Sequence, residues 1–395
     1  MTSYLIRRGI QMIFVVILAT IAIFGLLNAV PGGPLSGLNM AVGAKNRLSA
    51  QEIARIEQTL GLNKPFYLSY LTWLLGEDWL DEVGNAIGNP GPADKMATTG
   101  TWADFQSPQC VTAGGTNEGA DPEKRAPCNR GVLRWDWGES WALARGQTVT
   151  SVIGSRIKNT LILMTTVTVI SLVIAIPIGI ISAVRQYSKL DYAVTTFSFF
   201  GIAMPVFWFG LLMIILFTLQ FREWGLPYFP SGDVFTTRVT PGSIQDVLNI
   251  TPYTLADRAV HLFLPVFVLT LLYLAGWSRF MRSSMLEVLR QDYVRTARAK
   301  GLRERAVIAK HAARNALIPL ITIVVFQIPG IFSGAILTET IFNYPGMGRL
   351  FIDALGRDDW PIVMAILFIT AILVVIATLV GDVLYTVVDP RIRFD

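Results

Sequence analysis

Charged residues are scarce in this chain of 395 residues, and their scarcity indicates the class of protein. Asp, Glu, Lys and Arg together make up 15% of the sequence, whereas hydrophobic residues make up 52%. A soluble chain of this length would ordinarily form two or three domains, but this composition is typical of proteins embedded in a membrane. The sequence therefore predicts an all-α integral membrane fold.

Signatures of catalysis and of nucleotide binding are also missing. No GxxxxGK[ST] phosphate-binding loop occurs, and no nucleophile, metal cluster or pair of carboxylates forms a recognisable constellation. We interpret Asp358 and Asp359 as part of a solvated loop, and His261 and His311 as isolated residues without a functional role. The chain is thus predicted not to be an enzyme and to bind no metal or cofactor itself.

Long apolar runs take the place of the missing charge. The first, Ile10 to Val30, has 21 uncharged residues, enough for about 30 Å of helix and one membrane crossing. A cleaved signal peptide would have a shorter apolar core, so we favour an uncleaved anchor over residues 1–30. Five further runs bring the predicted spans to six: Leu161 to Val184, Tyr192 to Leu219, Val260 to Trp277, Leu317 to Leu337 and Ile362 to Val388.

Basic residues indicate the side of the membrane on which each loop lies. They occur before the first span, in the loop after the second and in the C-terminal tail: Arg7, Arg8, Arg185, Lys189, Arg391 and Arg393. Short loops rich in Lys and Arg stay in the cytoplasm, so both termini are expected there, and the net charge of +5 reflects topology rather than a nucleic-acid partner. Residues 31–158 are then external, and residues 159–395 form the membrane core.

The chain has only two cysteines, Cys110 and Cys128, and both fall in the predicted external region. In an oxidising compartment such a pair favours a disulfide over two free thiols. A metal site would need more ligands, and neither histidine is near them in the sequence. We therefore predict a disulfide between them.

One polar, strongly basic segment lies between two apolar runs, from Arg279 to Arg314 within the loop 279–316. It carries ten basic residues and three acidic ones. Apolar residues recur at helical spacing before Gly301 and a second helix-like turn follows from Glu304, which predicts a helix, a glycine corner and a second helix on the cytoplasmic side. Its two interpretations are a solvated loop held to anionic lipid and a docking site for a cytosolic partner.

The sequence DYVRTARAKGL followed by KHAARNALIP resembles the coupling loop of ABC-transporter permeases in the binding-protein-dependent dipeptide/oligopeptide import family. The general importer pattern has a glutamate where this chain has Arg295, a departure that resembles the peptide branch. Other stretches are similar to the same family: LGLNKPFYLSYLTWLL, DWGES, ETIFNYPGMGRLFIDALGRDDWPIV and GDVLYTVVDPRIRF. The resemblance covers most of the chain outside about residues 76–134, which the family commonly lacks and which we therefore treat as an external inserted loop that contains Cys110 and Cys128.

This resemblance implies the type I importer permease fold with six transmembrane helices in the inner (plasma) membrane. It implies half of a translocation pathway for peptides or similar small solutes, completed by a second, non-identical permease and served by an external solute-binding protein. ATP and Mg would be bound by two cytoplasmic ABC ATPase subunits that contact the basic loop. The residues expected to make this contact are Ala297, Gly301, Leu302, Glu304 and Arg305.

Several alternatives stay open at this point. A secondary transporter or channel working alone would usually show inverted repeats or intramembrane acids, and Asp382 is the main charge inside a predicted span; it either pairs with a loop arginine or faces the headgroups. Prolines within the spans are kinks or shape the pathway. The substrate is open among dipeptides, oligopeptides, nickel chelates, opines and oligosaccharides.

Overall fold

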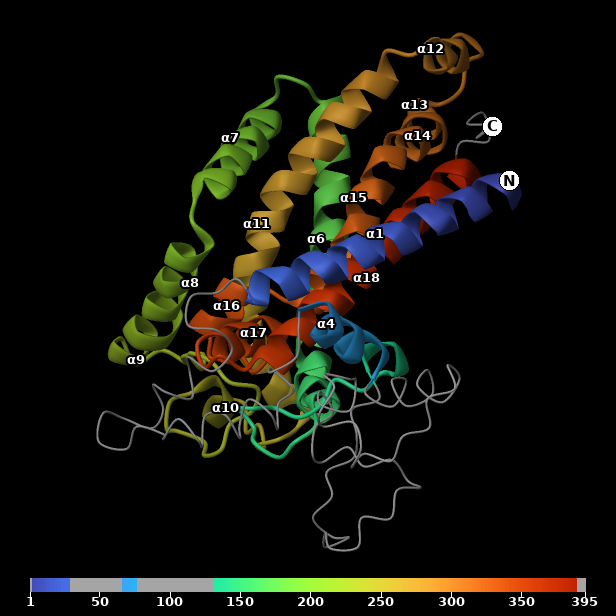
Figure 1. Ribbon diagram of the computed structural model, residues 1–395. Helices are drawn as coiled ribbons and strands as arrows, with labels where there is room; N and C mark the ends of the chain where they lie inside the picture. Colours follow the sequence, from blue (N-terminus) through green and yellow to red (C-terminus); the bar gives the residue numbers. More distant parts are fainter. Residues whose placement is uncertain (1, 29–65, 77–130, 389–395) are drawn as a thin grey trace, which may run out of the picture. The chain divides into compact units, whose positions relative to one another are not determined.

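The computed structural model describes residues 2–28, 66–76 and 131–388, and the predicted all-α fold is confirmed (Figure 1). These ranges contain helices and no β-strand. Most of the predicted insertion, with Cys110 and Cys128, lies outside the described residues, as do the first residue and residues 389–395.

Six helical segments in the described ranges are long and apolar enough to cross a membrane, as predicted. They are Arg7–Gly25, Val149–Val184, Val206–Glu223, Leu255–Leu289, Ile318–Ile341 and Trp360–Leu384. The helices are α1 (Thr2–Asn28), α4 (Phe66–Leu75), η3 (Val132–Arg134), α6 (Val149–Val184), α7 (Lys189–Ala203), α8 (Val206–Ile214), η4 (Ile215–Gln220), α9 (Phe221–Glu223), α10 (Ile244–Val247), α11 (Leu255–Leu289), α12 (Asp292–Ala299), α13 (Glu304–Ala306), η5 (Val307–Ala313), α14 (Arg314–Ala316), α15 (Ile318–Ser333), α16 (Ile336–Ile341), α17 (Met347–Leu355) and α18 (Trp360–Val388).

The third span differs from the prediction, which treated Tyr192 to Leu219 as one helix. The chain breaks between α7 and α8, where Met204 is extended with φ −83° and ψ 123° and is followed by Pro205. A proline ring disfavours the helical conformation of the residue before it, so the helix ends there. The candidate span is therefore formed by α8, η4 and α9, and α7 is a separate helix.

Two helices are longer than their predicted spans. α6 has 36 residues and starts at Val149 rather than Leu161, and α11 has 35 residues and runs well past Trp277. At 1.5 Å per residue each is about 50 Å long, more than the hydrocarbon core of about 30 Å that a span must cross. Both helices therefore extend beyond the apolar layer.

The chain divides into two compact units. One contains residues up to Val16, Ser155–Ile352 and the chain from Ile369, and the other contains Ile17–Gly154 and Asp353–Phe368. In the first, two buried clusters lie towards opposite ends of α11, one around Met281 and Met285 and one around Leu264 and Val268. Also in the first unit, Asp382 of α18 accepts from Nε of Arg8 in α1 at 2.8 Å, so one of its partners comes from the first helix.

The second unit has an aromatic core. The ring of Phe368 lies 6.0 Å from Trp73 and 5.2 Å from Trp137, measured between centroids. Asp359, predicted to be solvated, is instead completely buried. Its carboxylate accepts hydrogen bonds from the Ser140 hydroxyl and from the backbone N–H groups of Trp141, Ala142 and Leu143. Four donors from a segment distant in sequence offset the cost of burying this charge, which the local pattern could not indicate.

Candidate functional site

The predicted helix–glycine–helix corner is present at the end of α11, where Figure 1 shows α12 turning away from that helix. α12 ends at Ala299, and the backbone N–H of Gly301 donates to the carbonyl of Arg298 at 2.9 Å. Gly301 has φ +74°, and a Cβ atom placed there would meet no atom of the described chain within 4 Å. Glycine is favoured at this helix end by the left-handed backbone conformation and not by crowding from its own chain.

One face of α12 is packed against the chain itself. Val294 and Ala297 are buried in one cluster with Met281 and Met285 of α11 and with Val307 of η5. Ala297 was expected to enter the groove of a partner, but its side chain is enclosed in this cluster. We therefore assign Ala297 to the support of the corner.

The opposite side of the corner is exposed. Leu302 is 43% exposed although it is apolar, and Glu304 and Arg305 are also exposed. Arg298 donates from Nη2 to Oε1 of Glu304 at 2.8 Å, and this hydrogen bond holds the pKa of Glu304 below its usual value. The expected site residues are thus divided: Gly301 shapes the turn, Leu302, Glu304 and Arg305 form its surface, and Ala297 lies beneath it.

The segment after the corner is wound more loosely than an α-helix. Val307–Ala313 forms the π-helix η5, with Val307, Ala312 and Ala313 buried in the same cluster as α12. Such π-helical turns are rare and occur frequently at functional sites. Residue periodicity alone does not distinguish a π turn from an α turn, so this feature was not predicted.

A partly buried ion pair near the same end of α11 was also not predicted. Arg282 donates from Nε to Oδ1 of Asp191 at 2.6 Å and from Nη2 to Oδ2 at 2.9 Å. The hydrogen bond from Arg282 holds the pKa of Asp191 well below its usual range, against the opposing effect of burial. Asp191 directly precedes an apolar run in the sequence, where it resembles an ordinary loop residue.

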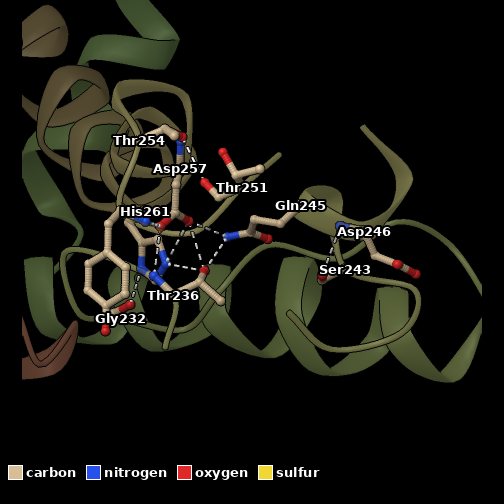
Figure 2. Close-up of polar contacts among 10 residues, drawn as sticks. Gly232, Thr236, Ser243, Gln245, Asp246, Thr251, Thr254, Asp257 and His261 are labelled. Carbon is tan, nitrogen blue, oxygen red and sulfur yellow. Dashed lines mark hydrogen bonds and ion pairs between the residues drawn. The ribbon is translucent and has the colours of Figure 1, made fainter. Parts of the chain in front are cut away.

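The other end of α11 carries a second buried polar cluster (Figure 2). Thr236 donates its backbone N–H to Oδ2 of Asp257 at 2.9 Å, and its hydroxyl lies 2.9 Å from Nε2 of His261. Gln245 reaches the Thr236 hydroxyl at 3.0 Å, and Nδ1 of His261 is 2.6 Å from the carbonyl of Gly232. His261 was predicted to be isolated, but it is part of this network.

Glu339 is a further buried carboxyl group that sequence reasoning missed. It lies in α16, accepts from the Thr160 hydroxyl at 2.8 Å and from the backbone N–H of Arg349 at 3.0 Å, and is completely buried. These bonds join α6, α16 and α17. Among the residues that the structure describes, no three His, Cys, Asp or Glu side chains are grouped so as to hold a metal ion.

Comparison with known proteins gives matches over the whole chain. The model of the family "binding-protein-dependent transport system inner membrane component" matches residues 175–394, and that of its N-terminal part matches residues 1–85. The oligopeptide transport system permease protein AppB of Bacillus subtilis is 36% identical, with 100% of both chains covered. The di/tripeptide transport system permease protein DppB of Pseudomonas aeruginosa is 34% identical, and the dipeptide permease DppB of Escherichia coli is 30% identical; each match covers 100% of this chain and 99% of the relative.

Proposed function

Because the chain belongs to the family of binding-protein-dependent transport system inner membrane components, we propose that it is a peptide permease subunit of an ABC importer. It forms half of the pathway through the inner membrane, and a second, non-identical permease forms the other half. The observation that carries the proposal is the full-length similarity to relatives named as oligopeptide, di/tripeptide and dipeptide permeases. An external solute-binding protein delivers the peptide.

ATP and Mg are bound by two separate ATPase subunits in the cytoplasm, since the sequence has no phosphate-binding loop. We propose that each permease presents one corner to one ATPase, and that in this chain the contact is the surface formed by Gly301, Leu302, Glu304 and Arg305. Two features support the assignment. The corner is fixed to α11 by buried side chains, and its outer side carries an exposed leucine amid charges.

The orientation follows from the positive-inside rule. The α12–α13 corner and both termini lie in the cytosol, and the segment between α1 and α6 lies outside. With α11 about 50 Å long, its Asp257 end reaches the external side and its Arg282 end the cytosolic side. The network around Asp257 then stabilises the external end of the same helix that carries the corner.

Reconstitution of the complex tests this function. A tag on this chain is used to isolate it with its partners, and the complex is placed in vesicles with the binding protein and radiolabelled dialanine or trialanine. ATP-dependent accumulation by the full complex, and none by this chain alone, is the expected result. ATP-independent uptake by the isolated chain would contradict the proposal, because it would indicate a transporter working alone.

A further inference from the structure

The Asp191–Arg282 pair joins three parts of the chain at one carboxylate. Besides the two bonds from Arg282, Asp191 accepts from the Ser182 hydroxyl in α6 and from the backbone N–H of Tyr187 in the α6–α7 turn. Asp191 lies in the first turn of α7, and its side chain is 4% exposed. The pair therefore fixes the end of α6, the start of α7 and α11 to one another.

Arg282 is placed directly beside the support of the α12–α13 corner. Its neighbour Met281 and the nearby Met285 are fully buried in the cluster that also encloses Val294 and Ala297 of α12. A displacement of the corner must therefore move this part of α11, since close-packed interiors transmit strain rather than absorb it. Arg282 moves with the same helix segment.

α7 is packed along α11 beyond the ion pair. The hydroxyls of Ser198 and Ser278 are 3.4 Å apart, and a Cβ atom on Gly201 would lie only 2.6 Å from that of Ala275. Along these contacts the residue numbers increase in α7 and decrease in α11, so the two helices are antiparallel. α7 then ends at the break before Pro205, beyond which the span of α8 begins. Figure 1 shows α7 beside the half of α11 that carries α12.

Resting on the proposed function, we propose that Asp191 and Arg282 are positioning residues that transmit a displacement of the α12–α13 corner to α7 and thereby to the pathway. An ion pair that is largely withdrawn from water contributes little net stability compared with apolar residues of similar size, whereas its geometry is strongly directional. The pair thus fixes the positions of α6, α7 and α11 relative to one another on the cytosolic side. Without the pair, the corner still contacts the ATPase, but α7 no longer follows it.

The test compares uptake per ATP hydrolysed in vesicles that contain the complete complex. The double variant Asp191→Asn/Arg282→Gln removes both charges, so it leaves no unpaired buried charge to disrupt folding. We expect assembly, thermal stability and peptide-stimulated ATP hydrolysis close to those of the wild type. Uptake of labelled trialanine per ATP is expected to fall by about ten-fold, within the range usual for coupling between sites.

Two further variants separate positioning from stability. Arg282→Lys keeps a positive charge beside Asp191 but loses the bidentate hydrogen bonding. Its uptake per ATP is therefore expected to lie between those of the wild type and the double variant. Asp257→Asn removes a carboxylate of equal burial at the other end of α11, about 38 Å along the helix axis, and should lower uptake and ATP hydrolysis together without changing their ratio.

The outcomes distinguish the inference from the function on which it rests. The role of the pair is overturned if uptake per ATP stays at the wild-type value in both the double variant and Arg282→Lys. It is also overturned if Asp257→Asn lowers uptake per ATP as much as the double variant does. Either result leaves the proposed importer function intact. If the wild-type complex shows no ATP-dependent uptake of the labelled peptides, the proposed function fails and the inference fails with it.

Discussion

Arg298 and Glu304 face each other across Gly301. Nε of Arg298 lies 3.2 Å from both carboxylate oxygens of Glu304, and Nη2 lies 2.8 Å from Oε1. The side chains are 42% and 55% exposed, so the pair contributes at most about 1 kcal/mol to stability. Its hydrogen bonds nevertheless link the two sides of the turn, and Leu302 and Arg305 are exposed beside it.

We expect Gly301→Asn to be tolerated and Gly301→Asp to abolish peptide-stimulated ATP hydrolysis and uptake. Asparagine and aspartate both tolerate the left-handed conformation better than other residues with a Cβ atom, so the two variants carry similar backbone strain and differ in charge. The chain leaves open space around Gly301, so a defect of Gly301→Asp beyond that strain would come from charge at the ATPase contact. Both variants are measured in vesicles after equal membrane insertion has been verified. Normal uptake by a well-inserted Gly301→Asp would remove the corner from the mechanism.

Leu302 and Ala297 should respond differently to the same substitution. Leu302→Asp places a charge on an exposed position and is expected to weaken ATPase binding while the melting temperature of the isolated chain stays unchanged. Ala297→Asp buries a charge in the cluster with Met281, so it should lower the melting temperature and reduce the amount of inserted protein. Pull-down of the ATPases and melting in detergent are measured for both. Equal destabilisation by the two would show that Leu302 is a support residue as well.

Asp359 and Asp358 form a matched pair for a stability experiment. Asp359→Ala leaves the Ser140 hydroxyl and three backbone N–H groups without their charged acceptor, so we expect a loss of about 3 kcal/mol. Asp358 has φ 53°, a conformation that asparagine also adopts, so Asp358→Asn should change stability by less than about 0.5 kcal/mol. Tryptophan fluorescence during unfolding measures both. A loss for Asp359→Ala as small as that expected for Asp358→Asn would mean that the carboxylate of Asp359 is dispensable.

We expect the corner and the predicted insertion to lie on opposite sides of the membrane. In a chain with Cys110 and Cys128 replaced by serine, Leu302→Cys should react with an impermeant thiol reagent only from the cytosolic side, and Asp94→Cys only from the outside. Inside-out and right-side-out vesicles provide the comparison. Labelling of Asp94→Cys from the cytosol alone would refute the six-span arrangement with external insertion.

Cys110 and Cys128 are predicted to form a disulfide. Closing a loop of this length stabilises the local fold by about 3 kcal/mol in the chain-entropy description. Peptide mapping of freshly isolated protein without reductant should give one linked pair of peptides, and a matched Cys110→Ser variant should leave Cys128 open to alkylation. Two alkylated thiols in the unmodified chain under oxidising conditions would refute the bridge.

The sequence alone determined the features that depend on local composition. Six apolar runs indicated six helices, since a helix in lipid must satisfy its own backbone hydrogen bonds. The position of Gly301 between two helical patterns indicated the corner, because the left-handed conformation at a helix end favours glycine. The break at Pro205 was accessible from the sequence as well, although we predicted a continuous span there.

Only the tertiary structure decided which charged side chains are buried and whether Ala297 packs against its own chain. Asp191 meets Arg282 across 91 positions and Asp359 meets Ser140 across 219, so no local pattern could predict either contact. No local pattern could predict the contacts of Ala297 either, because an alanine side chain is equally apolar whether it packs against α11 or against a partner. Burial of a polar or small side chain depends on which donors and apolar groups the distant parts of the chain bring to it, and only the packed helices determine that.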